Sequence, residues 1–267
     1  MTGDDHALAR ALAEEAGRRL TGLRAQGGDP GVLRKAGDRL SHEFLTAELA
    51  DRRPGDIVLS EEGADDPARL AARRVWIVDP LDGTREFGEP GRTDWAVHVA
   101  LWERAALLPP GGTTPPSPPG DLTAGAVALP AQGRVLSTLE PPPGPEEDHG
   151  ASGRIRIVVS RSRAPQLVRN ISDLIDAEPV PVGSAGAKVA AVVTGEADAY
   201  VHAGGFYEWD TAAPVAVARA AGYHASRIDG SPLVYNQADL LMPDILVCRP
   251  AVAGVLLQTI REVTDAS

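Results

Sequence analysis

The sequence predicts an α+β fold in which helices and mixed β-sheets alternate in layers. Three observations point to it: apolar residues at helical spacing near the N-terminus, short apolar runs typical of strands, and alternating strand and helix patterns through the second half. The 267 residues, 43% of them hydrophobic, are enough to build a sizeable core. We find no internal repeat and expect one compact unit with two halves, residues 1–150 and 151–267.

The first half is expected to open with two amphipathic helices and to continue with strands. Apolar side chains recur at helical spacing from Leu8 to Leu23, and residues 26–31 break this helix. A second helix contains Leu40 and Leu49 and ends at Pro54, which cannot continue a helix. Strands are then predicted at residues 57–59, 75–78, 95–102, 124–129 and 134–139.

The second half alternates between short strands and helices, and Gly222 ends one of the helices. Two Pro-rich segments, residues 109–119 and 140–150, are expected to be exposed hairpin excursions and not domain linkers. Strands are predicted at residues 155–159, 179–182, 199–202 and 246–248, and helices at residues 167–175, 188–194, 210–221 and 252–263.

Charge and cysteine content limit the possible functions. The formal net charge of −11 argues against a nucleic-acid partner, and an acidic protein that acts on phosphates needs bound cations. No apolar run approaches the roughly 20 residues that span a bilayer, and residues 1–6 do not resemble a signal peptide. Cys248 is the one cysteine, so no intrachain disulfide can form. We therefore expect a soluble cytoplasmic protein that does not associate with membranes.

The segment Asp79-Pro80-Leu81-Asp82-Gly83-Thr84 is the most informative part of the chain. It follows the predicted strand at residues 75–78, and Asp-Gly-Thr suits a tight turn that opens a helix. Two carboxylates on one rigid turn are ligands for hard cations, and backbone N–H groups at a helix start bind phosphate oxygens. The combination predicts metal-dependent phosphate chemistry.

Two further acidic segments lie next to predicted strands or helices. Glu61-Glu62 follows the strand at residues 57–59, and Asp210 lies in Trp209-Asp210-Thr211-Ala212-Ala213 where a helix begins. Taken alone, each acidic segment has another interpretation: the glutamates as a solvated loop, Asp210 as a helix cap, and the first two aspartates as turn formers. Their combination in one chain favours a metal site.

Together these segments resemble the inositol monophosphatase superfamily of metal-dependent, lithium-sensitive phosphatases. Residues 76–84 resemble its first signature and residues 209–214 its second, and Ser60-Glu61-Glu62-Gly63 stands where the family has its metal-binding Glu pair. The resemblance runs from about Gly37 to Cys248. It implies a layered α/β/α/β sandwich of the inositol monophosphatase/fructose-1,6-bisphosphatase type, and it suggests a homodimer.

The resemblance assigns the acidic residues to two or three Mg²⁺ ions. Glu61, Asp79 and the backbone carbonyl of Leu81 would hold the first ion, and a third, weaker ion would lie by Glu61. Asp79, Asp82 and Asp210 would hold the second ion. Oxygen-only ligands suit Mg²⁺, and no His or Cys cluster accompanies them to favour zinc. Two close metals activate a water, bind the phosphate and stabilise the leaving oxygen.

The resemblance also implies how the water is activated. The N–H groups of Gly83 and Thr84 would hold phosphate oxygens. In the family a Thr of the signature hydrogen-bonds an Asp from an N-terminal helix, and Thr84 and Asp38 are the candidates here. The alternative for Asp38 is a solvated or helix-capping residue, because the family usually has Thr three positions earlier, where this chain has Lys35. Lys35 would then approach the substrate phosphate instead.

Segments expected to bind the rest of the substrate lie in the second half. Ser160-Arg161-Ser162-Arg163 is similar to a Ser-Arg-Ser-His segment of bacterial CysQ-type 3'-phosphoadenosine 5'-phosphate (PAP) phosphatases. Residues 183–188, which end in Lys188, resemble their Gly-Ser-x-x-Lys stretch. Arg161, Arg163 and Lys188 would hold a second phosphate, and a guanidinium would also stack on adenine. The alternative is surface charge at a strand end.

The resemblance therefore implies an Mg²⁺-dependent phosphatase of sulfate assimilation, with a small phosphorylated substrate, that converts PAP to AMP and phosphate. Arg163 in place of His, and an extra residue before Lys188, leave the substrate open, with inositol monophosphatase or fructose-1,6-bisphosphatase activity as alternatives. A non-catalytic metal- or nucleotide-binding sensor is a different class of function. A turnover assay with Mg²⁺ separates the sensor from an enzyme.

Overall fold

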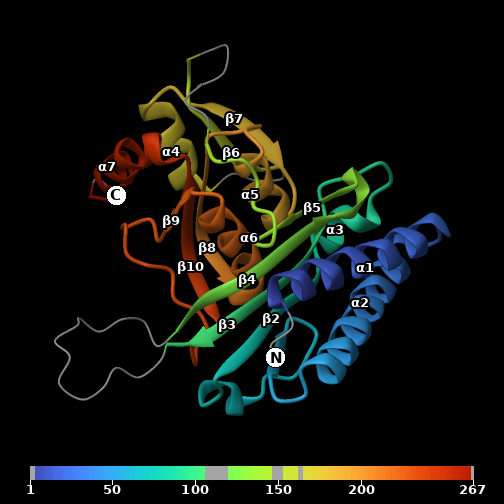
Figure 1. Ribbon diagram of the computed structural model, residues 1–267. Helices are drawn as coiled ribbons and strands as arrows, with labels where there is room; N and C mark the ends of the chain where they lie inside the picture. The colour runs from blue at the N-terminus through green and yellow to red at the C-terminus, as the bar shows by residue number, and fades with distance from the viewer. Residues whose placement is uncertain (1–3, 106–119, 146–152, 162–164, 266–267) are drawn as a thin grey trace, which may run out of the picture.

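The computed structural model describes residues 4–105, 120–145, 153–161 and 165–265 (Figure 1). It contains two five-stranded sheets, and helices lie between them and on their outer faces. The predicted layered sandwich of helices and mixed sheets is confirmed. One further helical layer, on the outer face of the second sheet, adds to the four that the sequence predicts.

The first sheet carries the segment that the sequence singles out. Its strands, in spatial order, are β1 (Ile57–Ser60), β2 (Arg74–Asp82), β3 (Ala96–Arg104), β4 (Gly120–Leu129) and β5 (Arg134–Ser137). Its connections contain the single turns η1 (Pro67–Leu70) and η2 (Pro130–Gln132) and the short helix α3 (Thr84–Gly88). β1 and β2 are parallel, and the other neighbours are antiparallel. Because β2 continues to Asp82, both aspartates of the segment belong to the strand and not to the turn after it.

Helices α1 (Asp5–Ala25) and α2 (Pro30–Arg52) pack over one face of this sheet. Asp29 caps α2, because its Oδ1 accepts hydrogen bonds from the N–H groups of Gly31 (2.9 Å) and Val32 (3.0 Å). Pro30 is tolerated in the first turn, where no intrahelical partner for an N–H is needed. The break between the helices is therefore shorter than the predicted residues 26–31, and Asp38 lies well inside a helix.

The second sheet is formed entirely by the second half of the chain. Its strands are β6 (Arg156–Ser160), β7 (Glu178–Val182), β8 (Ala199–Tyr207), β9 (His224–Ser226) and β10 (Leu241–Cys248), in the spatial order β7-β6-β8-β10-β9. β6 is parallel to both β7 and β8, whereas β10 is antiparallel to β8 and β9. The sequence does not predict β9, since His-Ala-Ser has no apolar run and its pairing with β10 alone makes it a strand.

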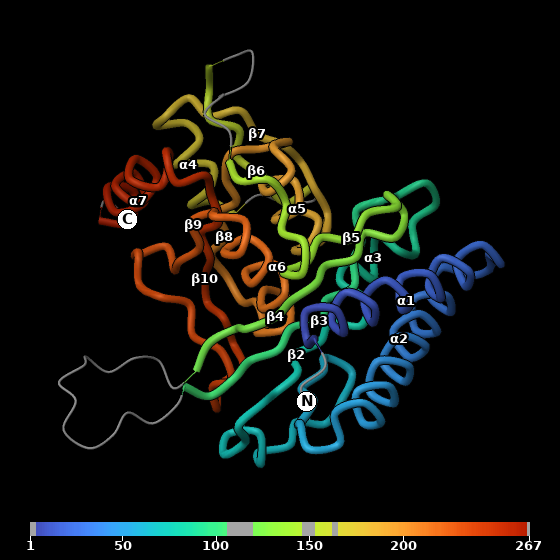
Figure 2. Tube along the Cα trace, in the orientation of Figure 1, coloured from blue at the N-terminus to red at the C-terminus, as the bar shows by residue number. Residues whose placement is uncertain are grey.

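Two helices pack between the two sheets and contact both of them. α5 (Ala185–Val193) and α6 (Glu208–Ala220) lie between them, and α4 (Gln166–Leu174) and α7 (Pro250–Asp265) cover the outer face of the second sheet (Figure 2). The central core cluster joins Ile77 of β2, Val192 of α5 and Ile245 of β10, among others. Removal of this apolar surface from water is the main favourable contribution to the packing of the two halves.

Several sequence expectations concern segments away from the core. Residues 109–119 and 146–150 of the Pro-rich segments lie outside the described residues, and residues 141–145 have no regular structure. Among the residues that the structure describes, no helix is both long and apolar enough to cross a membrane. Cys248 is buried in β10, and burial raises the pKa of its thiol to about 12, which makes the thiol unreactive.

Asp198 connects the start of β8 to two arginines. Its Oδ1 accepts hydrogen bonds from Nη2 of Arg156 (3.0 Å) and Nη1 of Arg249 (2.8 Å), and its Oδ2 accepts one from the backbone N–H of Arg156 (2.8 Å). Burial raises the pKa of this carboxyl, but the hydrogen bonds and charges of the arginines lower it by more. The net pKa therefore lies below the ordinary aspartate value.

We predict that Asp198→Asn lowers the free energy of unfolding by about 3 kcal/mol at pH 7, because it removes the negative charge that faces two largely buried guanidinium groups. Since the pKa of Asp198 is lower in the folded protein than in the unfolded chain, this difference is complete above the ordinary aspartate pKa of about 3.9. It shrinks as the pH falls through the folded value. Urea unfolding at pH 7 and pH 3 measures both statements.

The control variant is Asp176→Asn, which removes an exposed partner of Arg154 and should change the stability by less than about 1 kcal/mol. Equal losses in the two variants, or a loss at Asp198 that does not depend on pH, would contradict the assignment.

Candidate active site

Three carboxylates from distant parts of the chain meet in one cluster. Asp79 and Asp82 lie at the end of β2, and Asp210 lies in the first turn of α6. One oxygen atom of each carboxylate lies within 4.8 Å of the other two. The pairing of β2 with β3 is irregular, because Asp79 is opposite His98 whereas Asp82 is opposite Ala96. Such an irregularity bends a strand and redirects its side chains, and here both carboxylates reach the same cluster.

Asp210 is fixed by the start of α6. Its Oδ2 accepts a hydrogen bond from the backbone N–H of Tyr207 (2.7 Å), and the helix begins at Glu208, two residues before the predicted start. A carboxylate has two oxygens, so this hydrogen bond leaves a second oxygen for a cation. The capping interpretation and the metal-ligand interpretation of Asp210 are therefore compatible.

The cluster is electrostatically unfavourable without a cation. Burial, and then the charges of the neighbouring carboxylates, raise the pKa of Asp79 well above its ordinary value. Burial followed by carboxylate repulsion also raises the pKa of Glu61 to about 7 and that of Asp210 to about 6. A divalent cation among these oxygens would replace repulsion by attraction, and an all-oxygen donor set suits a hard cation such as Mg²⁺. The residues present thus fit the metal that the sequence predicts.

His98 is a member of the site that the sequence analysis misses. Its imidazole is fully buried, with Nε2 3.2 Å from Oδ2 of Asp82 and Nδ1 3.1 Å from the carbonyl oxygen of Trp209. Burial lowers the pKa of His98, but the charge and hydrogen bond of Asp82 raise it by more. Burial likewise raises the pKa of Asp82, and His98 together with hydrogen bonds from Gly186 and Ser184 lowers it by more. Only the register of β2 against β3 brings these residues together, and the sequence does not give that register.

The N-terminus of α5 also points at the cluster. Ser184 caps the helix, and the N–H groups of Ala185 and Gly186 donate to Oδ1 (3.1 Å) and Oδ2 (2.5 Å) of Asp82. The helix therefore begins before the predicted residue 188, and Ser184 is a helix-start signal that the sequence does contain. A Cβ atom on Gly186 would lie 2.1 Å from Nε2 of His98, so the close approach of helix and strand requires glycine.

The predicted pair for water activation is brought together. Oγ1 of Thr84, the first residue of α3, lies 3.2 Å from Oδ1 of Asp38 and 3.0 Å from the carbonyl oxygen of Leu81. α2 approaches this turn closely, since a Cβ atom on Gly37 would lie 2.9 Å from Cδ2 of Leu81. Burial, and then the charge of Glu62, raise the pKa of Asp38 to about 6, against the lowering effect of the Thr84 hydrogen bond.

Gly83 precedes α3 with a φ of +80°, which glycine tolerates. A Cβ atom here would lie 2.7 Å from Cβ of Ser184, so the turn also touches the start of α5. The predicted phosphate-binding N–H groups of Gly83 and Thr84 therefore lie next to a second helix start, that of α5.

The residues predicted to bind the rest of the substrate have different surroundings. Lys188 is 5% exposed, and its Nζ lies 5.6 Å from the ring centroid of Tyr200. Burial lowers the pKa of Lys188, while nearby carboxylates, Asp82 first, oppose that shift. Ser160 ends β6 beside Val182, and Ser162 and Arg163 lie outside the described residues.

Arg161 follows β6 and crosses to the first half of the chain. Its Nη2 lies 3.2 Å from Oε1 of Glu86 and 2.9 Å from Oε2 of Glu89. The guanidinium is therefore already paired with two carboxylates next to α3, and it can bind a phosphate only by exchange with them. The sequence does not predict this pairing, because it depends on how the segment after β6 packs against Glu86 of α3 and against Glu89 directly after that helix.

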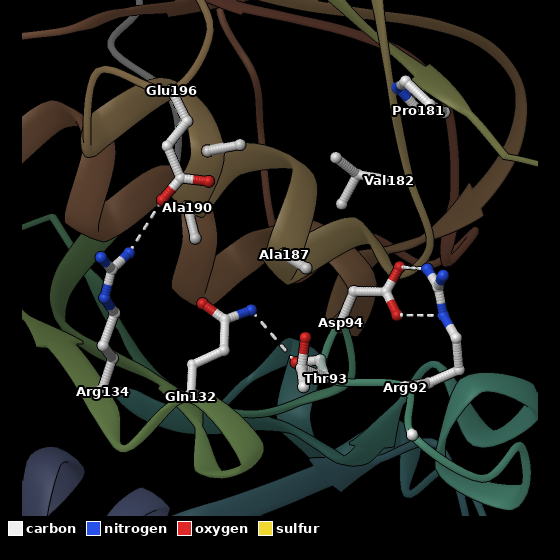
Figure 3. Close-up of a pocket in the computed structure, with 12 residues that line it drawn as sticks. Arg92, Thr93, Asp94, Gln132, Arg134, Pro181, Val182, Ala187, Ala190 and Glu196 are labelled. Atoms are coloured by element: carbon white, nitrogen blue, oxygen red, sulfur yellow. Dashed lines mark hydrogen bonds and ion pairs between the residues drawn. The ribbon is translucent and has the colours of Figure 1, made fainter.

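A cavity of about 210 Å³ lies beside α5 (Figure 3), and none of the three clustered carboxylates lines it. Its charged groups neutralise one another: Arg92 pairs with Asp94, and Arg134 pairs with Glu196 (2.9 Å). Asp94 also accepts a hydrogen bond from the N–H of Gly183 (2.7 Å), which holds the segment before α5. The side chains around the cavity thus help to hold the segment before α5. The residues that line the cavity offer no set of converging catalytic groups.

Comparison with known proteins adds independent findings. Residues 5–265 match the family model described as the inositol monophosphatase family. A Mycobacterium leprae protein named 3'-phosphoadenosine 5'-phosphate phosphatase is 50% identical over 261 residues, which cover 97% of this chain and 94% of the relative. An Escherichia coli protein named 3'(2'),5'-bisphosphate nucleotidase CysQ is 32% identical over 213 residues, 75% of this chain and 78% of the relative.

Solved structures show the same architecture. The crystal structure of CysQ from Bacteroides thetaiotaomicron, a bacterial member of the inositol monophosphatase family, has a TM-score of 0.73 and 27% identity, with 93% of this chain and 98% of that chain covered. Inositol monophosphatase II from Staphylococcus aureus has a TM-score of 0.74 over 94% of this chain and 93% of its own. At 20% identity the second similarity concerns the fold alone.

We predict that Mg²⁺ raises the melting temperature of this protein and that Asp79→Asn removes most of the increase. Without Mg²⁺ the variant should be more stable than the parent, because it lacks one of the repelling buried carboxylates. Since the pKa of Asp79 is raised in the folded protein, this gain should grow as the pH rises above the ordinary value of about 3.9. Thermal unfolding in EDTA and in excess Mg²⁺, at pH 5 and pH 8, measures both effects.

A 100-fold excess of Mg²⁺ over its Kd should stabilise the parent by about 2.7 kcal/mol. Asp173→Asn, on the exposed face of α4, is the matched control and should keep the full Mg²⁺ effect. An equal Mg²⁺ effect in the parent and in Asp79→Asn would show that the cation binds elsewhere.

Proposed function

The chain belongs to the inositol monophosphatase family, and we propose that it is a metal-dependent phosphomonoesterase that hydrolyses the 3'-phosphate of PAP to give AMP and phosphate. The observation that carries the reaction class is the meeting of the Asp79, Asp82 and Asp210 carboxylates beside the turn that holds Thr84 against Asp38. The choice of PAP rests on the relatives that bear this activity in their names.

The acidic residues would hold the cations. Asp79, Asp82 and Asp210 provide one set of oxygens, and Glu61 with the carbonyl of Leu81 extends it. Bound divalent cations supply Lewis-acid activation of a phosphoryl oxygen and of water. The site is strongly negative by itself, so we infer that phosphate enters only when cations are present.

Asp38 and Thr84 would position and deprotonate the attacking water. When the Thr84 hydroxyl donates to Asp38, its oxygen can accept a hydrogen bond from the water. The pKa of Asp38 is raised to about 6, which is closer to a neutral working pH than that of an ordinary aspartate. This makes Asp38 a better general base. The proton then passes from the water to Thr84 and from Thr84 to Asp38.

The second phosphate of PAP would be held by cations of the second half. Lys188 is buried, makes no ion pair within the described ranges, and lies close enough to the carboxylate cluster for its charge to matter. Arg161 is available by exchange, because its partners Glu86 and Glu89 belong to the turn beside the phosphate site. Ser160 and Arg163 complete the proposed segment on sequence grounds.

We further propose the finer properties that the family resemblance implies. These are Mg²⁺ as the cation, two or three ions during turnover, inhibition by Li⁺, a homodimer, and a role in sulfate assimilation. A cytoplasmic location is supported by the lone, buried cysteine, which forms no intrachain disulfide.

We predict that Thr84→Ala and Asp38→Asn each lower kcat by 100-fold or more with little change in KM, because they disturb water activation and leave phosphate binding intact. The assay uses purified protein with PAP and saturating Mg²⁺. Thr21→Ala is the control, since the Thr21 hydroxyl donates to the carbonyl of Gly17 within α1 and has no other hydrogen bond to the residues that the structure describes. A normal kcat for Asp38→Asn beside an impaired Thr84→Ala would mean that another group is the base.

The substrate assignment is tested by comparing kcat/KM for PAP, inositol 1-phosphate and fructose 1,6-bisphosphate under one set of conditions. We expect PAP to be preferred. Lys188→Met should lower kcat/KM for PAP by about tenfold or more, because the lost contact to a charged group is worth roughly 1.5–3 kcal/mol. Inositol 1-phosphate has no second phosphate and should be affected less. Equal losses for both substrates would remove the support for a second phosphate site, and a preference for either sugar substrate would overturn the PAP assignment.

A further inference from the structure

A chain of hydrogen bonds, buried except at the exposed Asp65, joins two segments next to proposed metal ligands. The first segment follows Glu61 and leads into η1, and the second is the start of α6 with Asp210. Four residues form the connection, which we call the Arg69–Glu208 bridge: Asp65, Arg69, Asn236 and Glu208.

Arg69 is the centre of the bridge. Its side chain is 1% exposed. Nε lies 2.6 Å from Oδ1 of Asp65, and Nη1 donates to Oδ1 of Asn236 at 2.9 Å. Asn236 returns a hydrogen bond from Nδ2 to the carbonyl oxygen of Arg69 (3.0 Å). Arg69 therefore holds the loop after Glu61 and the loop before β10 at the same time.

Glu208 completes the connection to α6. Its carboxylate is buried and accepts the N–H groups of Asn236 (2.6 Å) and Gln237 (2.7 Å). A second contact, from the hydroxyl of Tyr235 to Oγ1 of Thr211 (3.2 Å), fixes the same loop to the same turn of the helix. Asn236 itself has a φ of +59°, a conformation in which the surrounding hydrogen bonds hold it.

The bridge connects the segments on which two proposed cation ligands lie. Asp210 belongs to the carboxylate cluster, and Glu61, from the other half of the chain, is proposed to extend it. The N–H of Glu61 donates to the carbonyl oxygen of Val78 (3.4 Å), and Asp210 lies on a helix that packs in the central core, so each backbone has an anchor of its own. The bridge adds a direct link between the segment after Glu61 and the first turn of α6. Such a link would help to keep the oxygens at a spacing that cations can share.

We propose that Arg69 is a positioning residue for cation binding, which acts by holding the Glu61 segment against the first turn of α6 through Asn236 and Glu208. This inference rests on the metal site of the proposed function. It assigns no contact between Arg69 and the substrate or the cations. Groups that orient metal ligands without touching the metal typically change metal affinity by 10–100-fold when they are removed.

The test measures Mg²⁺ binding directly, by isothermal titration calorimetry on protein freed of metal. Arg69→Met should weaken the Mg²⁺ affinity by about tenfold. The Mg²⁺ concentration for half-maximal turnover should rise by a similar factor, while kcat at saturating Mg²⁺ stays within about twofold of the parent. A general loss of structure would instead lower kcat at every Mg²⁺ concentration.

Two further variants make the result decisive. Arg227→Met is the matched control, because Arg227 lies at the start of the same loop and pairs with Asp244 (2.7 Å) but has no contact with the Glu61 segment. It should lower the melting temperature and leave the Mg²⁺ affinity unchanged. Asn236→Gly keeps the positive φ and the N–H to Glu208 but removes the link to Arg69, and it should weaken Mg²⁺ binding in the same direction as Arg69→Met.

The possible results distinguish a failure of the positioning role of Arg69 from a failure of the proposed function. If the parent binds Mg²⁺ and both Arg69→Met and Asn236→Gly bind it equally well, the positioning role is overturned and the proposed function stands. If Arg69→Met does not fold, Asn236→Gly decides by the same criterion. If the parent binds no Mg²⁺, the proposed function is overturned and the positioning role falls with it.

Discussion

Repulsion among buried carboxylates is the constraint on which the rest of this structure depends. Asp79, Asp82 and Asp210 are held close together and are largely shielded from the water that would screen their charges, and the more exposed Glu61 adds its charge to theirs. Such an arrangement is unfavourable for folding by itself, so the chain must hold it through other contacts. Three features help to hold this cluster in place: the irregular end of β2, the start of α5 and the Arg69–Glu208 bridge.

Neighbouring groups compensate the negative charges of the clustered carboxylates to different extents, so the carboxylates differ in their roles. Asp82 receives His98 and the N–H groups of α5, and its pKa falls below the ordinary value although it is buried. Asp79 receives only the backbone N–H of Leu81 (3.0 Å) among the hydrogen bonds described, and its pKa stays raised. Asp82 is thus the carboxylate that joins the two halves, whereas Asp79, Glu61 and Asp210 would gain most from a bound cation, because its charge would offset the burial and repulsion that raise their pKa.

The sequence predicts the chemistry of the site better than its geometry. The signature around Asp79 and Asp82, and the pairing of Asp38 with Thr84, could be proposed because they depend on short segments with a strong resemblance. His98 could not, because its role depends on which residue of β3 lies opposite Asp79. The pairing of Arg161 with Glu86 and Glu89 also depends on the packing of the two halves, and a local pattern contains no information about it.

The paired state of Arg161 bears on how a strongly acidic protein selects a substrate with two phosphates. Within the described chain, the cations nearest the cluster are His98, which is engaged by Asp82, and Lys188, whose charge burial disfavours. An anion that brings one phosphate gains little from Arg161, because breaking the contacts with Glu86 and Glu89 offsets the new one. An anion with a second phosphate at the right distance supplies a stronger, divalent partner and can make the exchange favourable. Selection of a substrate with two phosphates over one with a single phosphate would then depend on the ion pairs of Arg161 as much as on Arg161 itself. A ligand must carry enough negative charge to replace Glu86 and Glu89.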